Sequence, residues 1–294
     1  MVGVSEIDTE PLAVARVAQQ LAAEAAAFVR RRRAEVFDDG SQADADAAIR
    51  SKSTPTDPVT VVDTETERLL RERLAQLRPD EPILGEEEGG PDGGDDDERL
   101  TWVLDPIDGT VNFVYGIEAF AVSIGVQRGG VSIAGAVADV AHGVVYAAAA
   151  GHGAWMVGDG ASTRLRCSAA SSLPMALVGT GFSYQPDDRR RQGAVVAQLL
   201  PEIRDLRRIG SCALDLCMVA AGRLDAYFED GVHVWDWAAG GLIAAEAGAV
   251  VRAPGSAGAG LMVAAAPGVA TAFDDVLRRC GVDLGIDRDG VGER

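Results

Sequence analysis

Two carboxylates that could do chemistry stand three positions apart in the stretch WVLDPIDGTVNFVYG, residues 102–116. Asp105 and Asp108 flank Pro106 and precede Gly109, at the end of an apolar run. Asp, Pro and Gly are common turn formers, so one interpretation is a simple reversal of the chain. The other is that both carboxylates converge on a hard cation, which needs several oxygen ligands.

Further acids stand in similar surroundings elsewhere in the chain. Asp63 follows VTVV, Glu86 follows PILG, and Asp236 lies inside HVWDWAAG just before an expected helix. A hard dication such as Mg²⁺ binds through a few carboxylates, waters and phosphate oxygens, so acids from scattered strand ends and helix starts are suitable ligands. Behind the DPID turn, Gly109 and Thr110 begin an expected short helix, whose exposed amides would bind an anion. These groups predict a site where cations meet a phosphate group.

The composition limits the class of protein. A chain of 294 residues that is 47% hydrophobic can bury a large core. Its net charge of −18 argues against a nucleic-acid partner, because binding a phosphate backbone takes a basic stripe. The run of arginines at 30–33 closes an expected helix, where cations complement the helix dipole, and we expect it to be solvated. Bound cations would explain how so acidic a protein accepts an anionic substrate.

Several other kinds of site are not supported by the sequence. The three histidines form no HExxH motif, and no GK[ST] of a phosphate-binding loop occurs. Gly179 and Gly181 lack the third glycine of a dinucleotide fingerprint. DPIDGT differs in spacing from the haloacid dehalogenase signature DxDG[TV], and the single lysine, Lys52, lies upstream of it. The four cysteines show neither a CxxC pair nor zinc spacing, so reduced thiols are expected.

The expected elements alternate between helices and strands, which predicts a layered α/β architecture. Between residues 100 and 150, β-branched runs separated by glycines predict several successive strands rather than a membrane span. Glu67 is assigned to the solvated face of the second helix, and residues 89–99 to a flexible acidic loop. The expected helices cover residues 12–33, 64–77, 187–200, 211–221 and 235–247; further strands cover 58–63, 81–90, 175–180 and 224–229, and a last strand and helix cover 261–279.

Five blocks in the chain carry a family resemblance. They are KSTPTDPVTVVD (52–63), GEE (85–87), WVLDPIDGTVNFVYG (102–116), RRIGSCALDLCMVAAGRLDAYFE (207–229) and WDWAAGGLIAAEAGA (235–249). In type and order they resemble the signature regions of the inositol monophosphatase family, closest to its bacterial SuhB type. The resemblance implies a layered αβαβα sandwich, usually dimeric, that hydrolyses small phosphate monoesters with Mg²⁺ and is inhibited by Li⁺.

The same resemblance implies roles for single residues. Glu86, Asp105 and the Ile107 carbonyl would hold a first ion, Asp105, Asp108 and Asp236 a second, and Glu86 with waters a weaker third. Thr110, hydrogen-bonded to Asp63, would help Glu86 to orient and deprotonate the attacking water, so that no covalent phosphoenzyme forms. The residues implied in substrate binding are Asp108, Gly109, Thr110, Gly210, Ser211, Cys212, Glu229 and Asp236.

Some positions keep alternative interpretations. Glu229 would accept a hydrogen bond from a ring hydroxyl, or would only cap a strand end. Cys212 stands where relatives commonly carry Ala, and with Cys217 it is favoured as plain core on one helix. Lys52 could approach the water network of the metal site or be an ordinary surface lysine.

We therefore expect an Mg²⁺-dependent phosphatase that releases myo-inositol from inositol 1-phosphate. The alternatives are a relative acting on fructose bisphosphate, a 3′-phosphonucleotide or histidinol phosphate, or a regulatory binding protein in RNA metabolism. We expect a cytoplasmic homodimer without a membrane partner, since the acidic first ten residues do not resemble an export signal. One phosphatase domain spans 1–294, with the metal motifs in a half of about 12–150, the substrate loop and last ligand in about 151–282, and a flexible tail at 283–294.

Overall fold

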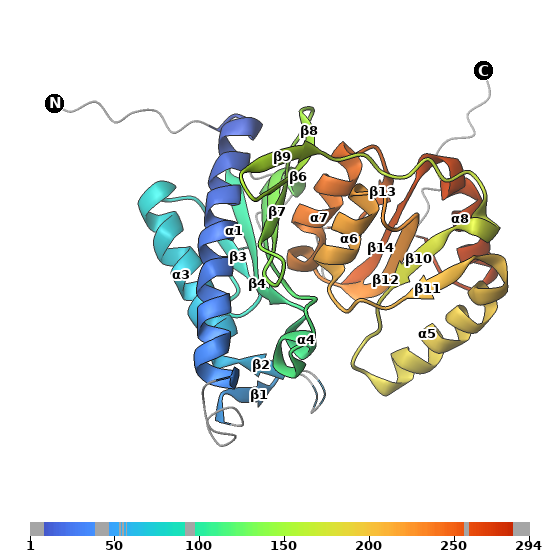
Figure 1. The fold of residues 1–294 in the computed structure, drawn as a ribbon, viewed down its shortest axis with the longest axis horizontal. Coiled ribbons are helices and arrows are strands. Elements are labelled where there is room, and N and C mark those ends of the chain that lie inside the picture. Colours follow the sequence, from blue (N-terminus) through green and yellow to red (C-terminus); the bar gives the residue numbers. More distant parts are fainter. Residues whose placement is uncertain are drawn as a thin grey trace.

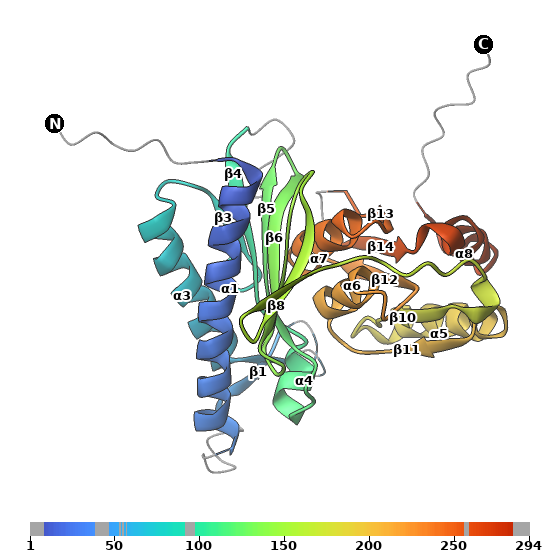
Figure 2. The ribbon, with the colours of Figure 1, turned by 45° about the horizontal axis from the view of Figure 1, so that its top comes forward.

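The protein, described here by a computed structural model over residues 9–38, 47–52, 54, 56, 58–91, 98–255 and 259–284, is built in five layers. Helices, a sheet, helices, a second sheet and a last layer of helices follow one another across the molecule (Figures 1 and 2). This is the αβαβα sandwich expected from the sequence, and it confirms the fold class. Most of the expected acidic loop and of the expected flexible tail lies outside the described residues.

The first sheet has seven strands in the order β3-β4-β5-β6-β7-β8-β9. Only the β3–β4 pair is parallel, and the other neighbours are antiparallel. The sheet continues past residue 150, where the sequence places the boundary between the two halves. The strands are β3 (Ile83–Gly85), β4 (Leu100–Asp108), β5 (Ala121–Arg128), β6 (Val131–Asp139), β7 (Val144–Ala149), β8 (Gly153–Gly158) and β9 (Ala161–Arg164).

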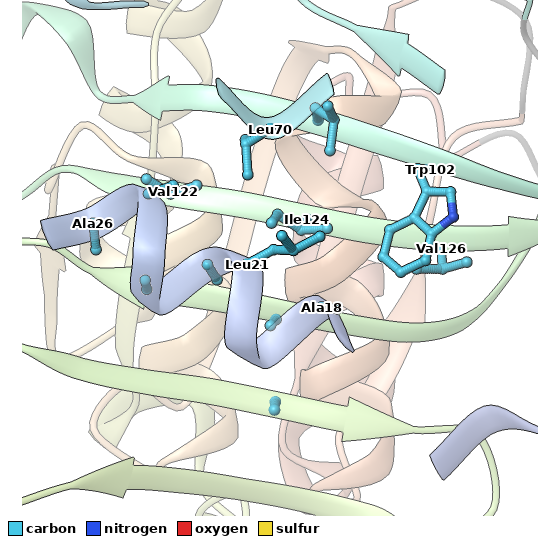
Figure 3. Packing of buried hydrophobic residues seen from close by; sticks show 14 of the residues in the cluster. Ala18, Leu21, Ala26, Leu70, Trp102, Val122, Ile124 and Val126 are labelled. Carbon is cyan, nitrogen blue, oxygen red and sulfur yellow. The ribbon is translucent and has the colours of Figure 1, made fainter. Parts of the chain in front are cut away.

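Helices α1 (Pro11–Arg33) and α3 (Val61–Leu77) cover the outer face of this sheet. Figure 3 shows Leu21 of α1 and Leu70 of α3 packed with Ile124 of β5 in one buried cluster. By length and composition alone, the segment Pro11–Phe37 could cross a membrane. In the fold, its apolar stripe at helical spacing is buried against the sheet, which accounts for its hydrophobicity.

Helices α6 (Cys212–Ala220) and α7 (Val234–Glu246) form the middle layer, between the two sheets. Helix α7 lies very close to the first sheet because glycines face it. A methyl group added at Gly125 of β5 would lie 2.6 Å from the Cβ atom of Ala238. The C-terminal half of the sequence therefore supplies the inner cover of a sheet whose first five strands come from the N-terminal half.

The second sheet has five strands in the order β11-β10-β12-β14-β13. Strand β10 runs parallel to β11 and β12, and β14 runs antiparallel to β12 and β13. Helices α5 (Pro186–Leu199) and α8 (Pro267–Arg279) form the last layer. The strands of this sheet are β10 (Leu177–Thr180), β11 (Asp205–Arg207), β12 (Ala226–Val232), β13 (Val250–Arg252) and β14 (Gly260–Ala265). The remaining short elements of the described residues are η1 (Ala34–Asp38), β1 (Ile49–Ser51), β2 (Pro58–Thr60), α4 (Thr110–Tyr115), η2 (Leu173–Met175) and η3 (Leu200–Glu202).

Two expected elements near the candidate acids differ in the structure. The strand expected at 58–63 ends at Thr60, because Thr60 caps α3 and Asp63 reaches back from the third helical position to the Thr60 N–H. The DPID stretch is not a free turn. It is the last part of β4, with an irregular register between Asp105 and Asp108 that kinks the strand end.

The assignment of Glu67 to the solvated face of α3 was wrong. Its side chain is fully buried and accepts hydrogen bonds from the N–H groups of Glu87 and Glu88, at 2.8 and 3.0 Å. Arg71 pairs with the same carboxylate at 2.8 Å. A buried charge of this kind is tolerated when it is paired and hydrogen-bonded, and here it anchors the turn that carries Glu86.

The arginine run does close α1, as predicted, but it is not simply solvated. The Arg30 guanidinium donates to the Val140 carbonyl at 2.8 Å, and Arg33 donates to the Phe113 carbonyl at 3.1 Å. These contacts tie the end of α1 to the loop after β6 and to α4.

Candidate active site

A pocket of about 450 Å³ opens where β4 ends and where α4, α6 and α7 begin. Loops that follow β10 and precede α7 complete its walls. The pocket brings together acids that are up to 150 positions apart in the sequence. Of the predicted site residues, those that line it are Glu86, Asp105, Ile107, Asp108, Gly109, Thr110, Gly210, Cys212, Glu229 and Asp236.

Asp105, Asp108 and Asp236 form the centre of the pocket. One carboxylate oxygen of each lies within 4.8 Å of the others. Each aspartate also has an oxygen bound by its own chain. The Ile107 N–H donates to Asp105 Oδ1 at 3.0 Å, the Ser211 hydroxyl to Asp108 Oδ2 at 2.6 Å, and the His233 N–H to Asp236 Oδ2 at 2.6 Å. These backbone and hydroxyl donors thus fix one oxygen of each carboxylate and leave its second oxygen for another ligand.

The electrostatics of these carboxylates indicate that nearby positive charge does not offset their burial and mutual repulsion. Burial, followed by Glu86 and Asp108, raises the pKa of Asp105 well above the usual range, and burial with neighbouring carboxylates does the same for Asp236. Burial raises the pKa of Asp108 to about 7, although hydrogen bonds from Ser211 and Ala213 oppose the shift. Such a cluster needs protons or a cation, and three fixed carboxylate oxygens fit a hard divalent ion.

The start of α4 forms one wall. Gly109 is its N-cap with φ of 93°, a left-handed conformation that favours glycine, and an added methyl group would lie 2.9 Å from the Ala119 carbonyl oxygen. The Thr110 hydroxyl lies 3.1 Å from Asp63 Oδ1 and 2.9 Å from the Ile107 carbonyl oxygen. Asp63 itself is fully buried behind Thr110 and does not line the pocket.

Glu86 also lines the pocket but lies outside the group of three aspartates. Lys52 Nζ is 2.7 Å from Glu86 Oε1 and 2.5 Å from Glu87 Oε1. Lys52 is therefore part of the site, which favours the first of its two interpretations. The Glu86 N–H donates to the Leu104 carbonyl at 3.1 Å, which fixes the glutamate beside β4.

A further wall comes from the second half of the chain. Ser211 caps α6 and, with the Ala213 N–H at 2.7 Å, holds Asp108 from behind, so it supports the pocket without lining it. Cys212 lines the pocket, yet it is only 5% exposed, and Cys217 on the same helix is core. Glu229 lies within β12, so it does not cap a strand end.

Several residues of the site were missed by the sequence analysis. Glu67 and Tyr227 have no motif of their own, since a buried acid in a helix and an aromatic in a strand resemble ordinary residues. The loop after β10 would have been a reasonable candidate, because loops at strand ends commonly carry ligand contacts. Its pocket residues are Phe182, Ser183, Tyr184 and Gln185, and the start of α7 adds its N-cap His233 and Trp235 of its first turn.

Five layers with fixed acids at one strand end and two helix starts define a hydrolase of the layered phosphatase class. The sequence profile of the inositol monophosphatase family matches residues 10–277, and the chain belongs to that family. It is 61% identical to the inositol-1-monophosphatase SuhB of Mycobacterium tuberculosis over 277 residues, which cover 92% of this chain and 96% of that protein. It is 39% identical to the Nus factor SuhB of Escherichia coli over 207 residues, or 70% and 75% of the two chains.

A solved structure shares the fold. Mycobacterium tuberculosis SuhB superimposes with a TM-score of 0.79 at 57% sequence identity, covering 93% of this chain and 98% of the other. The family and the fold together make this chain a phosphatase, and the resemblance inferred from the five sequence blocks is confirmed.

Proposed function

We propose that this phosphatase hydrolyses inositol 1-phosphate to myo-inositol and phosphate with Mg²⁺ as its cofactor. The observation that carries the proposal is the set of three aspartates, each fixed by its own chain and each with one oxygen left, beside a helix start and the Glu229 carboxylate. The 61% identical relative from Mycobacterium tuberculosis, named an inositol-1-monophosphatase, supports the choice of substrate.

The donor set of the pocket suits magnesium. The residues that would hold the ions are Glu86, Asp105, the Ile107 carbonyl, Asp108 and Asp236, all oxygen donors, as a hard cation requires. Bound Mg²⁺ would supply an acidified water and neutralise charge on the phosphoryl group. The cation would pair with Asp105 and Asp236, whose burial and mutual repulsion are otherwise not compensated.

The chain's own residues would orient the water and hold the phosphate. The Thr110 hydroxyl has Asp63 Oδ1 and the Ile107 carbonyl oxygen as acceptors for its proton, so its oxygen would accept a proton from the attacking water. Glu86 would take the proton that the water loses. The Gly109 and Thr110 amides at the start of α4 would donate to phosphate oxygens, because the first amides of a helix have no acceptor within it.

The polyol would lie toward the second half of the chain. Its hydroxyls would donate to Asp108 and Glu229, and the backbone at Gly210 with the Cys212 side chain would form the adjacent wall. Gly210 has a φ of 95°, a left-handed conformation that favours glycine in this wall.

The proposal is tested by assaying the purified protein with inositol 1-phosphate, fructose 1,6-bisphosphate, a 3′-phosphonucleotide and histidinol phosphate, with and without Mg²⁺. We expect the highest kcat/KM with inositol 1-phosphate, no turnover in EDTA and inhibition by Li⁺. A higher kcat/KM with another ester would replace the proposed substrate, and turnover that persists in EDTA would remove the cofactor.

A second candidate is a regulatory binding role, favoured by the similarity to the Escherichia coli relative named a Nus factor. The net charge of −18 disfavours direct binding to nucleic acid. Failure to hydrolyse any of the four esters would leave this candidate in place of the first.

We also propose that the protein is a cytoplasmic homodimer, which light scattering and cell fractionation would test.

A further inference from the structure

Strand β12 presents two polar side chains on one face. Tyr227 and Glu229 are two positions apart, and residues at this spacing point to the same side of a strand. The Tyr227 hydroxyl donates to Glu229 Oε2 at 2.6 Å. The tyrosine is fully buried, so this carboxylate replaces the water that its hydroxyl would otherwise bind.

The neighbouring strand leaves room for this pair. Gly179 of β10 is in register with Tyr227, and Gly181 follows two positions later, on the same face. A methyl group at Gly179 would lie 3.2 Å from the Tyr227 ring, and one at Gly181 would lie 1.9 Å from Glu229 Oε2. Gly181 therefore leaves room for the Glu229 carboxylate, which a larger residue would displace. A methyl group at Gly179 would instead lie closest to Leu224 and Asp215, at 2.8 and 2.9 Å.

The tyrosine proton gives this pair a direction. The single phenolic proton is given to the Glu229 carboxylate, the stronger acceptor. Glu229 lines the pocket, so the hydrogen-bonded pair ends there.

We propose that Tyr227 is a positioning residue, which holds the Glu229 carboxylate in one orientation so that it accepts a hydrogen bond from a hydroxyl of the substrate's polyol. This inference rests on the proposed function and specifies its selectivity. The hydrogen bond from Tyr227 to Glu229 selects esters whose alcohol carries a hydroxyl near the phosphate, and it contributes nothing to esters of simple alcohols or phenols.

The experiment compares inositol 1-phosphate with phenyl phosphate, which has no further hydroxyl, for the wild type and Tyr227→Phe. The variant keeps the buried ring and loses only the hydroxyl. We expect the ratio of the two kcat/KM values to fall about ten-fold, through KM for inositol 1-phosphate, as expected for the loss of one hydrogen bond to a charged group. Tyr146→Phe, at another buried tyrosine on β7, is the matched control and should leave the ratio unchanged.

Two further variants separate positioning from general damage. Glu229→Gln should lower the same ratio, and adding Tyr227→Phe to it should change little more, because both act on one contact. Gly181→Ala should also lower the ratio by displacing the carboxylate, with the tyrosine intact.

The outcomes distinguish this inference from the proposed function. Equal losses for the two substrates in Tyr227→Phe, or full additivity with Glu229→Gln, would overturn the positioning role and leave the substrate assignment standing. A wild-type enzyme that hydrolyses phenyl phosphate but not inositol 1-phosphate would overturn the substrate assignment, and with it the selectivity argued here.

Discussion

Replacing Asp105 by Asn should make the metal-free protein more stable while abolishing its activity. Asp105 is 1% exposed, and its Oδ1 atom accepts the Ile107 N–H at 3.0 Å, a bond that the Asn side-chain carbonyl can keep. The substitution therefore preserves shape and removes one charge from a repulsive cluster. It also removes one oxygen donor that the proposed ions require.

The size of the effect follows from the spacing of the cluster. Two charges 4.8 Å apart repel by about 3.5 kcal/mol at an effective dielectric constant of about 20. The pKa values of these carboxyls are raised, so bound protons already relieve part of the repulsion in the wild type. We therefore expect Asp105→Asn to increase the free energy of unfolding of the metal-free protein by about 1–3 kcal/mol near pH 8. For a chain of this size, that corresponds to a rise in Tm of roughly 2–10 °C.

Thermal unfolding with EDTA or Mg²⁺ measures both consequences. Free Mg²⁺ at about 100 times its Kd should stabilise the wild type by about 2.7 kcal/mol, and the variant by much less. Turnover should fall at least about 1,000-fold, since losing about 4 kcal/mol of charge stabilisation has this effect. Asp187→Asn, an exposed acid on α5, is the control and should change neither quantity. A destabilised Asp105→Asn protein, or one that keeps its Mg²⁺-dependent Tm shift and turnover, would refute the reasoning.

Three further predictions concern residues around the cluster. Gly109→Ala should lower kcat by about 100-fold, because alanine strains at a φ of 93° and its methyl group would lie 2.9 Å from the Ala119 carbonyl oxygen, so the amides of α4 would shift. A crystal structure and steady-state kinetics would check this. An unaltered kcat would exclude a close contact between these amides and the phosphate. Burial raises the folded-state pKa of Asp63 from 3.8 to about 7, so the folded protein retains a proton that the unfolded chain releases, and stability should fall as pH rises from about 4 to 7. In urea unfolding of the metal-free protein, Asp63→Asn should reduce the fall in the free energy of unfolding between pH 4 and 7 by up to about 4 kcal/mol. If the variant keeps the pH dependence of the wild type, Asp63 is ionised in the folded protein. Glu67→Gln should cost about 1–3 kcal/mol and lower turnover, because an amide donor would face the Glu87 N–H; normal stability in urea unfolding would argue against the anchoring role.

Much of the fold could be predicted from the sequence. The long helix α1 follows from apolar residues at helical spacing, and α6 and α7 begin near the residues expected. Short strands such as β9 and β11 were missed because three or four residues contain too little periodic pattern. The strand expected at 58–63 was too long, because the capping box formed by Thr60 and Asp63 outweighs the preference of the β-branched residues Val61 and Val62 for a strand.

The acids of the site could be identified as candidates, but their partners could not. Asp105, Asp108 and Asp236 stand out because an acid after an apolar run is unusual. Nothing local indicates that Ser211, some hundred positions away, donates to Asp108, or that Lys52 pairs with Glu86. Such contacts depend on how layers pack, which a single sequence does not state.

The sequence by itself determined which side chains stand at strand ends and helix starts, because hydrophobic periodicity, caps and glycines act over a few residues. The tertiary structure alone decided that these ends meet. Helix α7 lies close to the first sheet where Gly125 and Gly135 leave space, and this approach brings Asp236 to Asp105. It also decided that Glu67 is a buried anchor instead of a surface charge, since burial depends on what packs over a helix face.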